Sequence, residues 1–322
     1  MINNSESDSL FIDNQAINKQ SSYSPLISIV TVTKNLIRNG REKSFNIAID
    51  CIQNQTFRKI EHIVVDGASD DGTQKIILKA IKKYTEESKS VPIKYNSEPD
   101  LGLYDAMNKA VNIAKGQYIM FLNSDDTLAG PDVVEKIKAL INVSFPDFIY
   151  GTHIMVDTCG KEQELLNVKL AAFLQRMPFC HNSMVVQKDI FKKLGGHDLN
   201  YPVAADHEFV FKMLSTGYQG KFAKFPISVF KSGGISSDVT ACANDSALFW
   251  SKFFYDLGLR FNWSHSDYVR WYQIGQIPLK ACWYAFRKGQ KKSLLRKAAV
   301  HSALITIRRR IQPWRSWDNL KS

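Results

Sequence analysis

LISIVTVT, at residues 26–33, is a run of mostly apolar and β-branched side chains. Such a run is typical of a strand that is buried on both faces of a parallel sheet. Similar runs follow at residues 60–65 (IEHIVV), 93–96 and 117–122 (QYIMFL). The segments between them have helical character, at residues 44–54, 73–84 and 105–114. Because strand and helix alternate, the sequence predicts an α/β protein with a largely parallel sheet.

The alternation weakens after residue 130. We expect two further strands, at 148–156 and 183–187, and two further helices, at 189–194 and 205–215. Residues 1–24 are rich in Asn, Ser, Asp and Gln, which predicts a disordered leader. The predicted organisation is therefore a leader at 1–24, a catalytic domain at 25–238 and a helical C-terminal region at 239–322.

Composition excludes several classes of protein. The 322 residues are 44% hydrophobic, which is enough for one sizeable core. Five widely spaced cysteines without a CxxC pair argue against a disulfide framework and a zinc site. The sequence has no signal-peptide pattern and no apolar run of about 18 residues. We therefore expect a cytoplasmic protein in a reduced compartment.

The net charge of +11 is confined to one end of the chain. Residues 265–322 hold 13 basic and 2 acidic side chains, and the other residues hold 29 of each. The body is therefore neutral, and we do not expect it to bind nucleic acid along its surface.

Polar clusters follow three of the predicted strands, at residues 33–35, 66–71 and 123–126. In open α/β sheets, ligands bind outside the carboxyl ends of the strands. In the last cluster, Asn123, Asp125 and Asp126 offer the hard oxygen ligands that suit Mg²⁺ or Mn²⁺. The alternative is a solvated acidic turn that caps the next helix, and the cluster alone does not decide between them.

Three other clusters are open to two readings. The carboxylate of Asp66 could accept hydrogen bonds from a base or a ribose, or could belong to an ordinary acidic turn. Asp105 opens a helix, where it could be a cap alone. Asp206 also lies near a helix start, where it could be a base or a favourable first-turn acid.

Together and in this order, these motifs resemble the family 2 glycosyltransferases, and most closely the bacterial exopolysaccharide and O-antigen transferases. The resemblance covers roughly residues 26–236. It is carried by the segments TVTKN (31–35), VVDGASDDGT (64–73), SEPDLGLYDAMNKA (97–110), GQYIMFLNSDD (116–126), PFCHNSMVVQKDIFKKLGG (178–196) and AADHEF (204–209).

The resemblance implies a GT-A fold, a nucleotide-diphosphate sugar donor, either UDP- or GDP-linked, and inversion at the anomeric carbon. Carried over by position, the donor-binding residues are Thr31, Thr33, Asn35, Asp66, Gly67, Asp71, Asp105, Asn108, Ser124 and Asp125. The metal, Mg²⁺ or Mn²⁺, would be held by Asp125, with Asp126 and Asn123 beside it. Asp206 would be the general base. The residues near the acceptor or the phosphates would be His181, His207, Gly233 and Gly234.

The chain departs from the family pattern at two positions. Asn123 replaces the first aspartate of the DxD motif, which shifts the expected metal binding onto Asp125 and Asp126. Ala205 replaces the acidic neighbour of the base. The QxxRW motif of processive members is absent, which favours the addition of a single sugar.

The C-terminal region combines basic and aromatic side chains. Five of the six tryptophans lie between Trp263 and Trp317. Val300, Leu304, Ile307 and Ile311 form an apolar stripe at helical spacing. This mixture suits the headgroup region of an anionic membrane, and the family's acceptors are often saccharides linked to polyprenyl diphosphate. The alternatives are a helix packed on the catalytic domain with a solvated basic face, and nucleic-acid binding.

Two other functions compete with a transferase. A nucleotidyltransferase would need a glycine-rich phosphate loop early in the chain, and neither GxGxxG nor GxxxxGK[ST] occurs. A catalytically degenerate protein that serves as a membrane-associated assembly partner stays open because of Asn123 and Ala205. The leading expectation is a cytoplasmic transferase, peripheral to the inner face of the plasma membrane, that builds a surface polysaccharide.

Overall fold

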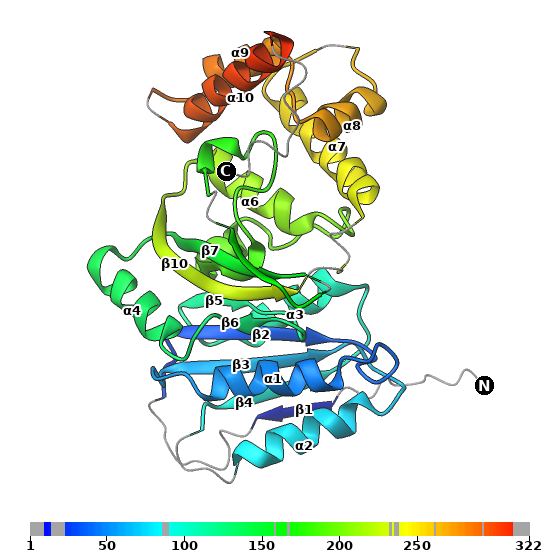
Figure 1. Cartoon of the computed structure of the whole chain (residues 1–322), viewed down its shortest axis with the longest axis vertical. Coiled ribbons are helices and arrows are strands. Elements are labelled where there is room, and N and C mark those ends of the chain that lie inside the picture. Colours follow the sequence, from blue (N-terminus) through cyan, green and yellow to red (C-terminus); the bar gives the residue numbers. More distant parts are fainter. Residues whose placement is uncertain are drawn as a thin grey trace, which may run out of the picture. The chain divides into compact units, whose positions relative to one another are not determined.

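The protein is described here by a computed structural model (Figure 1). The described residues are 10–13, 23–85, 90–157, 159–165, 168–231, 234, 238–260, 262–291 and 293–311. One mixed sheet organises the N-terminal part, with strand order β1-β4-β3-β2-β5-β9-β7-β10-β6 and β8 paired to β7. Helices accompany this sheet and also form the C-terminal part. The α/β class predicted from the sequence is confirmed.

Four parallel strands form the first half of this sheet. They are β2 (Ile27–Thr33), β3 (Ile60–Asp66), β4 (Ile93–Ser97) and β5 (Tyr118–Phe121), close to the predicted bounds. Their register places Thr33 beside Asp66, and Asp66 beside Ser97. The carboxyl ends of β2, β3 and β4 are therefore neighbours, and this register brings together two of the predicted clusters, at 33–35 and 66–71.

Two predicted helices bury one stripe each against this half of the sheet. In α1 (Glu42–Gln53), Phe45 and Ile49 lie in the same core cluster as Ile77 and Ile81 of α2 (Thr73–Thr85). The third predicted helix, α3 (Leu103–Ile113), packs on β2 and β3. The helical periodicity between the strands therefore identified these three elements.

The helix α4 (Val133–Ser144) was not predicted. Its apolar spacing was present, because Val133, Val134, Ile137 and Ile141 are all buried in the core.

Antiparallel pairing enters the second half of the sheet. Its strands are β6 (Thr127–Leu128), β7 (Phe148–Val156), β8 (Glu162–Leu165), β9 (Met184–Gln187) and β10 (Gly220–Lys231). The predicted strands correspond to β7 and β9. The strand β10 was missed, since Pro226 interrupts its pattern and the register shifts on both sides of that residue.

The predicted leader differs from the structure at residues 10–13. These residues form β1 (Leu10–Asp13), which pairs antiparallel with β4. The prediction of disorder is wrong for these four residues because β4 offers a free edge on which a strand can add. The other residues of the leader, apart from 23 and 24, lie outside the described residues.

The chain divides into two compact units. The first holds residues 1–164, 182–197 and 220–232, with the sheet, α1 to α4 and α5 (Lys188–Lys193). The second holds residues 165–181, 198–219 and 233–322. The division does not coincide with the predicted boundary between residues 238 and 239, because three segments of the predicted catalytic domain, 165–181, 198–219 and 233–238, group with the C-terminal helices.

The second unit is helical in its described residues, as expected for its C-terminal part. Its elements are the short turn η2 (Leu170–Ala172), α6 (Ala205–Thr216), α7 (Val239–Asp256), α8 (His265–Ile274), α9 (Leu279–Lys288) and α10 (Leu294–Ile311). Within the part of the chain that the structure describes, no helix is long and apolar enough to cross a membrane.

Candidate active site

Asp66, the last residue of β3, is the centre of a hydrogen-bond network in the first unit. Its side chain is fully buried. One carboxylate oxygen accepts from the hydroxyl of Thr33 at 3.2 Å, and the other accepts from the Ser69 amide and the Ser97 hydroxyl, each at 2.9 Å. These hydrogen bonds offset the cost of burying the polar carboxyl group. Asp66 therefore holds the ends of β2, β3 and β4 in one arrangement.

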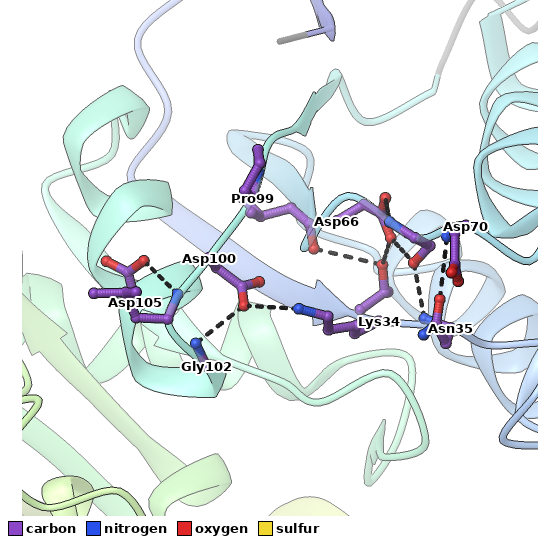
Figure 2. A network of polar contacts seen from close by, with 12 residues as sticks. Lys34, Asn35, Asp66, Asp70, Pro99, Asp100, Gly102 and Asp105 are labelled. Atoms are coloured by element: carbon purple, nitrogen blue, oxygen red, sulfur yellow. Dashed lines mark hydrogen bonds and ion pairs between the residues drawn. The ribbon is translucent and has the colours of Figure 1, made fainter. Parts of the chain in front are cut away.

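A second carboxylate lies directly over Gly67. Figure 2 shows Asp100 between Lys34 and Gly102, in the loop that follows β4. One oxygen of Asp100 lies 3.4 Å from the amine of Lys34 and accepts from the amide of Gly102 at 3.0 Å. A Cβ atom at position 67 would lie 2.1 Å from the other oxygen. Gly67 is therefore required by the close approach of Asp100.

The loops after β2 and β3 are bonded to each other. Asn35 has a left-handed backbone (φ 51°), and its amide donates to the Ser69 hydroxyl at 2.8 Å. Asp71 accepts from the amide of Arg38 at 2.8 Å and from the hydroxyl and amide of Thr73. Desolvation opposes ionisation of Asp71, but these hydrogen bonds outweigh it and lower its pKa to about 2. The loop residues of the predicted set thus form one connected surface.

Two other predicted donor-binding residues have structural partners. Thr31 is fully buried in β2, and its hydroxyl lies 3.0 Å from Nε2 of His62. Asn108 donates to the carbonyl of His197 at 2.8 Å and accepts from its amide at 2.9 Å. These contacts show that both side chains stabilise the fold, and their contact with a nucleotide stays a prediction.

Asp105 is held at the start of α3. Its carboxylate accepts from the Leu101 amide at 2.9 Å and forms an ion pair with Lys109 at 3.0 Å. Partial desolvation opposes ionisation of Asp105, but the Leu101 amide and the charge of Lys109 lower its pKa. Asp105 therefore binds the backbone just before the N-cap residue Gly102 and not an amide of the first turn, and a donor contact stays a prediction.

The two aspartates after β5, Asp125 and Asp126, have different surroundings. Asp126 is buried, and its carboxylate accepts from the side-chain amides of Asn182 and Asn123 and from the backbone amide of Lys231. The side chain of Asp125 is 24% exposed and lies 3.7 Å from the guanidinium of Arg41. Asp126 therefore faces the protein, and Asp125 keeps access to solvent.

The charge state of Asp126 follows from this position. Burial raises its pKa to about 7, and the negative charge of Asp125 adds to the effect, although the Lys231 amide opposes it. A cation beside Asp125 would lower this pKa again, because an opposite charge favours the ionised form. The pair is thus arranged so that a bound cation would be electrostatically favourable.

The donor set fits a weakly held divalent ion. No group of three or more His, Cys, Asp or Glu side chains within the described ranges is arranged to hold a metal. The amide oxygen of Asn123, however, is buried without a hydrogen-bond partner, and Asp125 is accessible. Both are hard oxygen ligands, and Mg²⁺ usually takes its remaining ligands from waters and phosphates.

Ser124 is buried in the loop that follows β5 of the first unit, and the other remaining predicted residues belong to the second unit. Asp206 is the second residue of α6. His207 is buried, lies 3.4 Å from the Ser246 hydroxyl, and has its pKa lowered to about 4, chiefly by burial. His181 is buried at the start of the short turn η3 (His181–Ser183). Gly234 has open space around it, and Gly233 lies outside the described residues.

Sequence reasoning missed three participants in this site. Asp100 stood inside a quoted motif but was read as part of a turn. Asn182 stood beside His181, and Lys231 contributes only a backbone amide. The last two contact Asp126 from positions 56 and 105 residues away, so only the fold brings them together.

Comparison with known proteins shows the family of this chain. Residues 28–196 match the family described as "Glycosyl transferase family 2". The chain belongs to this glycosyltransferase family. A "PGL/p-HBAD biosynthesis glycosyltransferase" of Mycobacterium bovis is 29% identical over 192 residues, which are 59% of this chain and 70% of the relative. An uncharacterised glycosyltransferase of Methanocaldococcus jannaschii is 28% identical over 61% of this chain and 67% of its own length.

Solved glycosyltransferase structures share the fold. The S. aureus TarS fragment 1–349, determined with UDP-GlcNAc, has a TM-score of 0.56 at 14% identity over 90% of this chain and 93% of the fragment. This chain covers 41% of the longer TarS chain. A mannosyltransferase from Pyrobaculum calidifontis, determined with GDP-Man and Mn²⁺, has a TM-score of 0.57 at 15% identity over 96% of this chain and 89% of its own. The GT-A fold implied by the resemblance is confirmed.

Proposed function

We propose that this glycosyltransferase moves one sugar from a nucleotide-diphosphate donor to a saccharide acceptor and inverts the anomeric centre. The observation that carries the donor site is the arrangement at the carboxyl ends of β2 to β5. There, Asp66 ties three strand ends together, and Asp125 is left accessible beside the buried Asp126. Solved relatives of the same fold bind UDP-GlcNAc and GDP-Man, which supports a nucleotide-sugar donor.

Asp125 would hold the divalent ion, with the amide oxygen of Asn123 as a further ligand. When bound, such an ion supplies Lewis-acid stabilisation of the charge that grows on the diphosphate leaving group. The buried Asp126 would keep this loop in place through its bonds to Asn182 and Lys231. The loops after β2, β3 and β4 would bind the base and the ribose.

Asp206 would act as the general base. It would take the proton of the acceptor hydroxyl, whose oxygen then forms the new bond to the anomeric carbon. Attack on the face opposite the leaving diphosphate inverts the configuration. We expect Asp206→Asn to bind donor normally and to lose transfer. Appreciable turnover by a correctly folded Asp206→Asn protein would remove the role.

A ligand panel tests the donor and the metal together. UDP-, GDP- and dTDP-sugars are added with and without Mn²⁺, and the melting temperature is measured. A ligand that binds only the native state raises apparent stability by mass action. We expect one nucleotide to stabilise the wild type in a Mn²⁺-dependent way and Asp125→Asn to lose that dependence. If none of these nucleotide sugars raises the melting temperature and none is hydrolysed in a metal-dependent way, the protein would instead be a catalytically degenerate assembly partner.

The acceptor would be a lipid-linked saccharide of bacterial surface polysaccharide synthesis, reached at an anionic membrane surface. The support is the outer face of α10. Val300, Leu304, Ile307 and Ile311 are 45%, 61%, 41% and 68% exposed. At about 100° per residue they share an arc of roughly 60°. The exposed Arg308 and Arg310 flank this stripe, so its apolar and cationic groups match an anionic bilayer.

The neighbouring helix α9 carries the same chemistry. Trp283 is 50% exposed, and the guanidinium of Arg287 lies 4.8 Å from the centre of its ring. Aromatic rings partition to the bilayer interface, and each basic residue near an anionic surface contributes about 1 kcal/mol. We therefore assign α9 and α10 jointly to membrane contact.

Vesicle co-sedimentation of the full chain tests this assignment. The variant Leu304→Gln/Ile311→Gln should lose binding to vesicles that contain phosphatidylglycerol. The control Val143→Gln removes an exposed apolar side chain from α4, where Val143 is 78% exposed, and should bind like the wild type. Equal binding by both variants would contradict membrane docking through α10.

A further inference from the structure

The N-cap residue of the helix that carries Asp206 offers no side-chain acceptor, and the carboxylate of Asp206 itself accepts from the amide of His207 at 2.8 Å. Ala204 is the N-cap residue of α6, and its methyl group cannot accept the backbone amides that the first turn leaves unpaired. A carboxylate of α7 binds the two backbone amides that directly precede this turn. One carboxylate oxygen of Asp245 accepts from the amide of Val203 at 2.8 Å and from the amide of Ala204 at 3.0 Å. Asp245 is 7% exposed, so this contact is sheltered from solvent.

A second contact joins α7 to the first turn of α6. Ser246, the next residue of α7, places its hydroxyl 3.4 Å from Nδ1 of His207, the residue after Asp206. The two helices are thus bonded on both sides of Asp206 in sequence. All of these residues belong to the second compact unit.

The electrostatics of Cys242 place both carboxylates in the same neighbourhood. Burial raises the pKa of this thiol to about 11, and the charges of Asp206 and Asp245 contribute to the rise. The family pattern has an acidic residue at position 205, where this chain has alanine. Asp245 supplies a carboxylate near that turn from another helix.

We propose that Asp245 is a positioning residue that fixes the first turn of α6 and thereby the direction of the Asp206 carboxylate. The inference rests on the proposed role of Asp206 as base. In a helix the Cα–Cβ direction follows from the backbone, so anchoring the amides of residues 203 and 204 sets where the side chain of residue 206 begins. A displacement of about 1 Å at a reacting group can cost about 100-fold in rate. The segment responsible, α7, lies outside the matched family region 28–196.

The test compares three substitutions of Asp245 in the full chain. Asp245→Asn keeps an oxygen acceptor at the same place and should retain kcat within about threefold. Asp245→Ala removes the acceptor, and Asp245→Glu displaces it by one methylene. Both should lower kcat by about 10- to 100-fold, with the KM of the donor unchanged. Asp245→Glu keeps the experiment decisive if Asp245→Ala does not fold.

The control is Asp267→Ala. The carboxylate of Asp267 accepts the amide of Ser264 at 2.8 Å and caps α8 in the same unit, so its loss should lower stability without lowering kcat. Hydrogen exchange gives a readout that needs no activity, because the amides of residues 203 and 204 should exchange faster in Asp245→Ala than in Asp245→Asn. Wild-type kcat in Asp245→Ala or Asp245→Glu, or equal losses in Asp245→Asn and Asp245→Ala, would overturn the proposal.

The variant Asp206→Asn distinguishes the positioning role of Asp245 from the proposed role of Asp206 as general base. An active Asp206→Asn protein would remove the base, whatever the Asp245 variants do. An inactive Asp206→Asn protein alongside a fully active Asp245→Ala protein would remove only the positioning role. If both assignments hold, adding Asp245→Ala to Asp206→Asn should lower the remaining rate no further, because the group being positioned is already absent.

Discussion

The Asp66 carboxylate accepts a hydrogen bond from the Ser97 hydroxyl at 2.9 Å, and this bond joins the carboxyl end of β3 to that of β4. Four donor groups from three different segments converge on the same carboxylate: the hydroxyls of Thr33, Ser69 and Ser97 and the amide of Ser69. The loops that would hold a nucleotide are therefore fixed by one buried group.

Removing the hydroxyl of Ser97 should weaken the contact between the carboxyl ends of β3 and β4. We expect Ser97→Ala to cost about 1 kcal/mol in the free energy of unfolding, measured by urea denaturation. Donor affinity, measured by titration calorimetry, should fall with it, because the loop after β4 loses an anchor. Unchanged stability and affinity would mean that Ser69 and Thr33 alone hold Asp66.

The two aspartates after β5 should respond differently to substitution by asparagine. Asp126→Asn places an amide donor against donors from Asn182 and Lys231, and should destabilise the protein by about 1–3 kcal/mol. Asp125→Asn should leave stability unchanged and weaken Mn²⁺ binding, measured by electron paramagnetic resonance. Equal stability losses in both variants would contradict the division of roles.

Gly67→Ala should displace Asp100. The new methyl carbon would lie 2.1 Å from a carboxylate oxygen, and we expect a loss of about 1–3 kcal/mol in stability. Adding Asp100→Ala should recover part of it, which a double-mutant cycle measures. Gly130→Ala is the matched control, because its nearest contact would be an ordinary 3.5 Å.

Asp71 should contribute a stability that depends on pH. Its pKa is lowered from 3.8 to about 2 in the folded protein, so its contribution is present above about pH 4 and is lost as the pH falls through 2. Calorimetry should find that Asp71→Asn lowers the melting temperature at neutral pH and that the gap closes on acidification. A gap that does not change with pH would contradict the role of these hydrogen bonds.

The opposite ends of β3 and β4 carry a buried ion pair. Glu61 and Lys94 lie 2.7 Å apart with side chains 0% and 2% exposed. Lys94→Met would leave an unpaired buried carboxylate and should cost about 3–5 kcal/mol by urea denaturation. The surface pair of Lys252 and Asp256 is the control, and Lys252→Met should cost under about 0.5 kcal/mol.

Much of the first half of the fold could be predicted, because its signals are local. The run at β2 and the periodicity of α1 to α3 each fall within one short window of sequence. The strand β10 could not be found this way, because Pro226 breaks its sequence pattern. Its extended conformation is instead specified by backbone pairing with β7. The same holds for β1, whose four residues become a strand through the edge of β4.

The relative position of the strand-end clusters was predictable, whereas their hydrogen-bond partners were not, and the role of these residues in a site stays a prediction. The clusters at the strand ends identified Asp66 and Asp125, because parallel strands bring their carboxyl ends to one edge. The hydrogen bonds that occupy Asp126 come from Asn182 and Lys231, and no local pattern indicates them.

The sequence by itself determined the α/β class, the order of the strand-end clusters, the family and the location of the positive charge. These features depend on side-chain periodicity and composition, which can be read from neighbouring residues. Only the tertiary structure decided that Asp126 faces the protein and Asp125 faces solvent, that Gly67 accommodates Asp100, and that Asp245 binds the backbone just before the helix of Asp206. Each of these depends on hydrogen bonds or contacts between residues that are distant in sequence, and burial and partners are set only when the chain has folded.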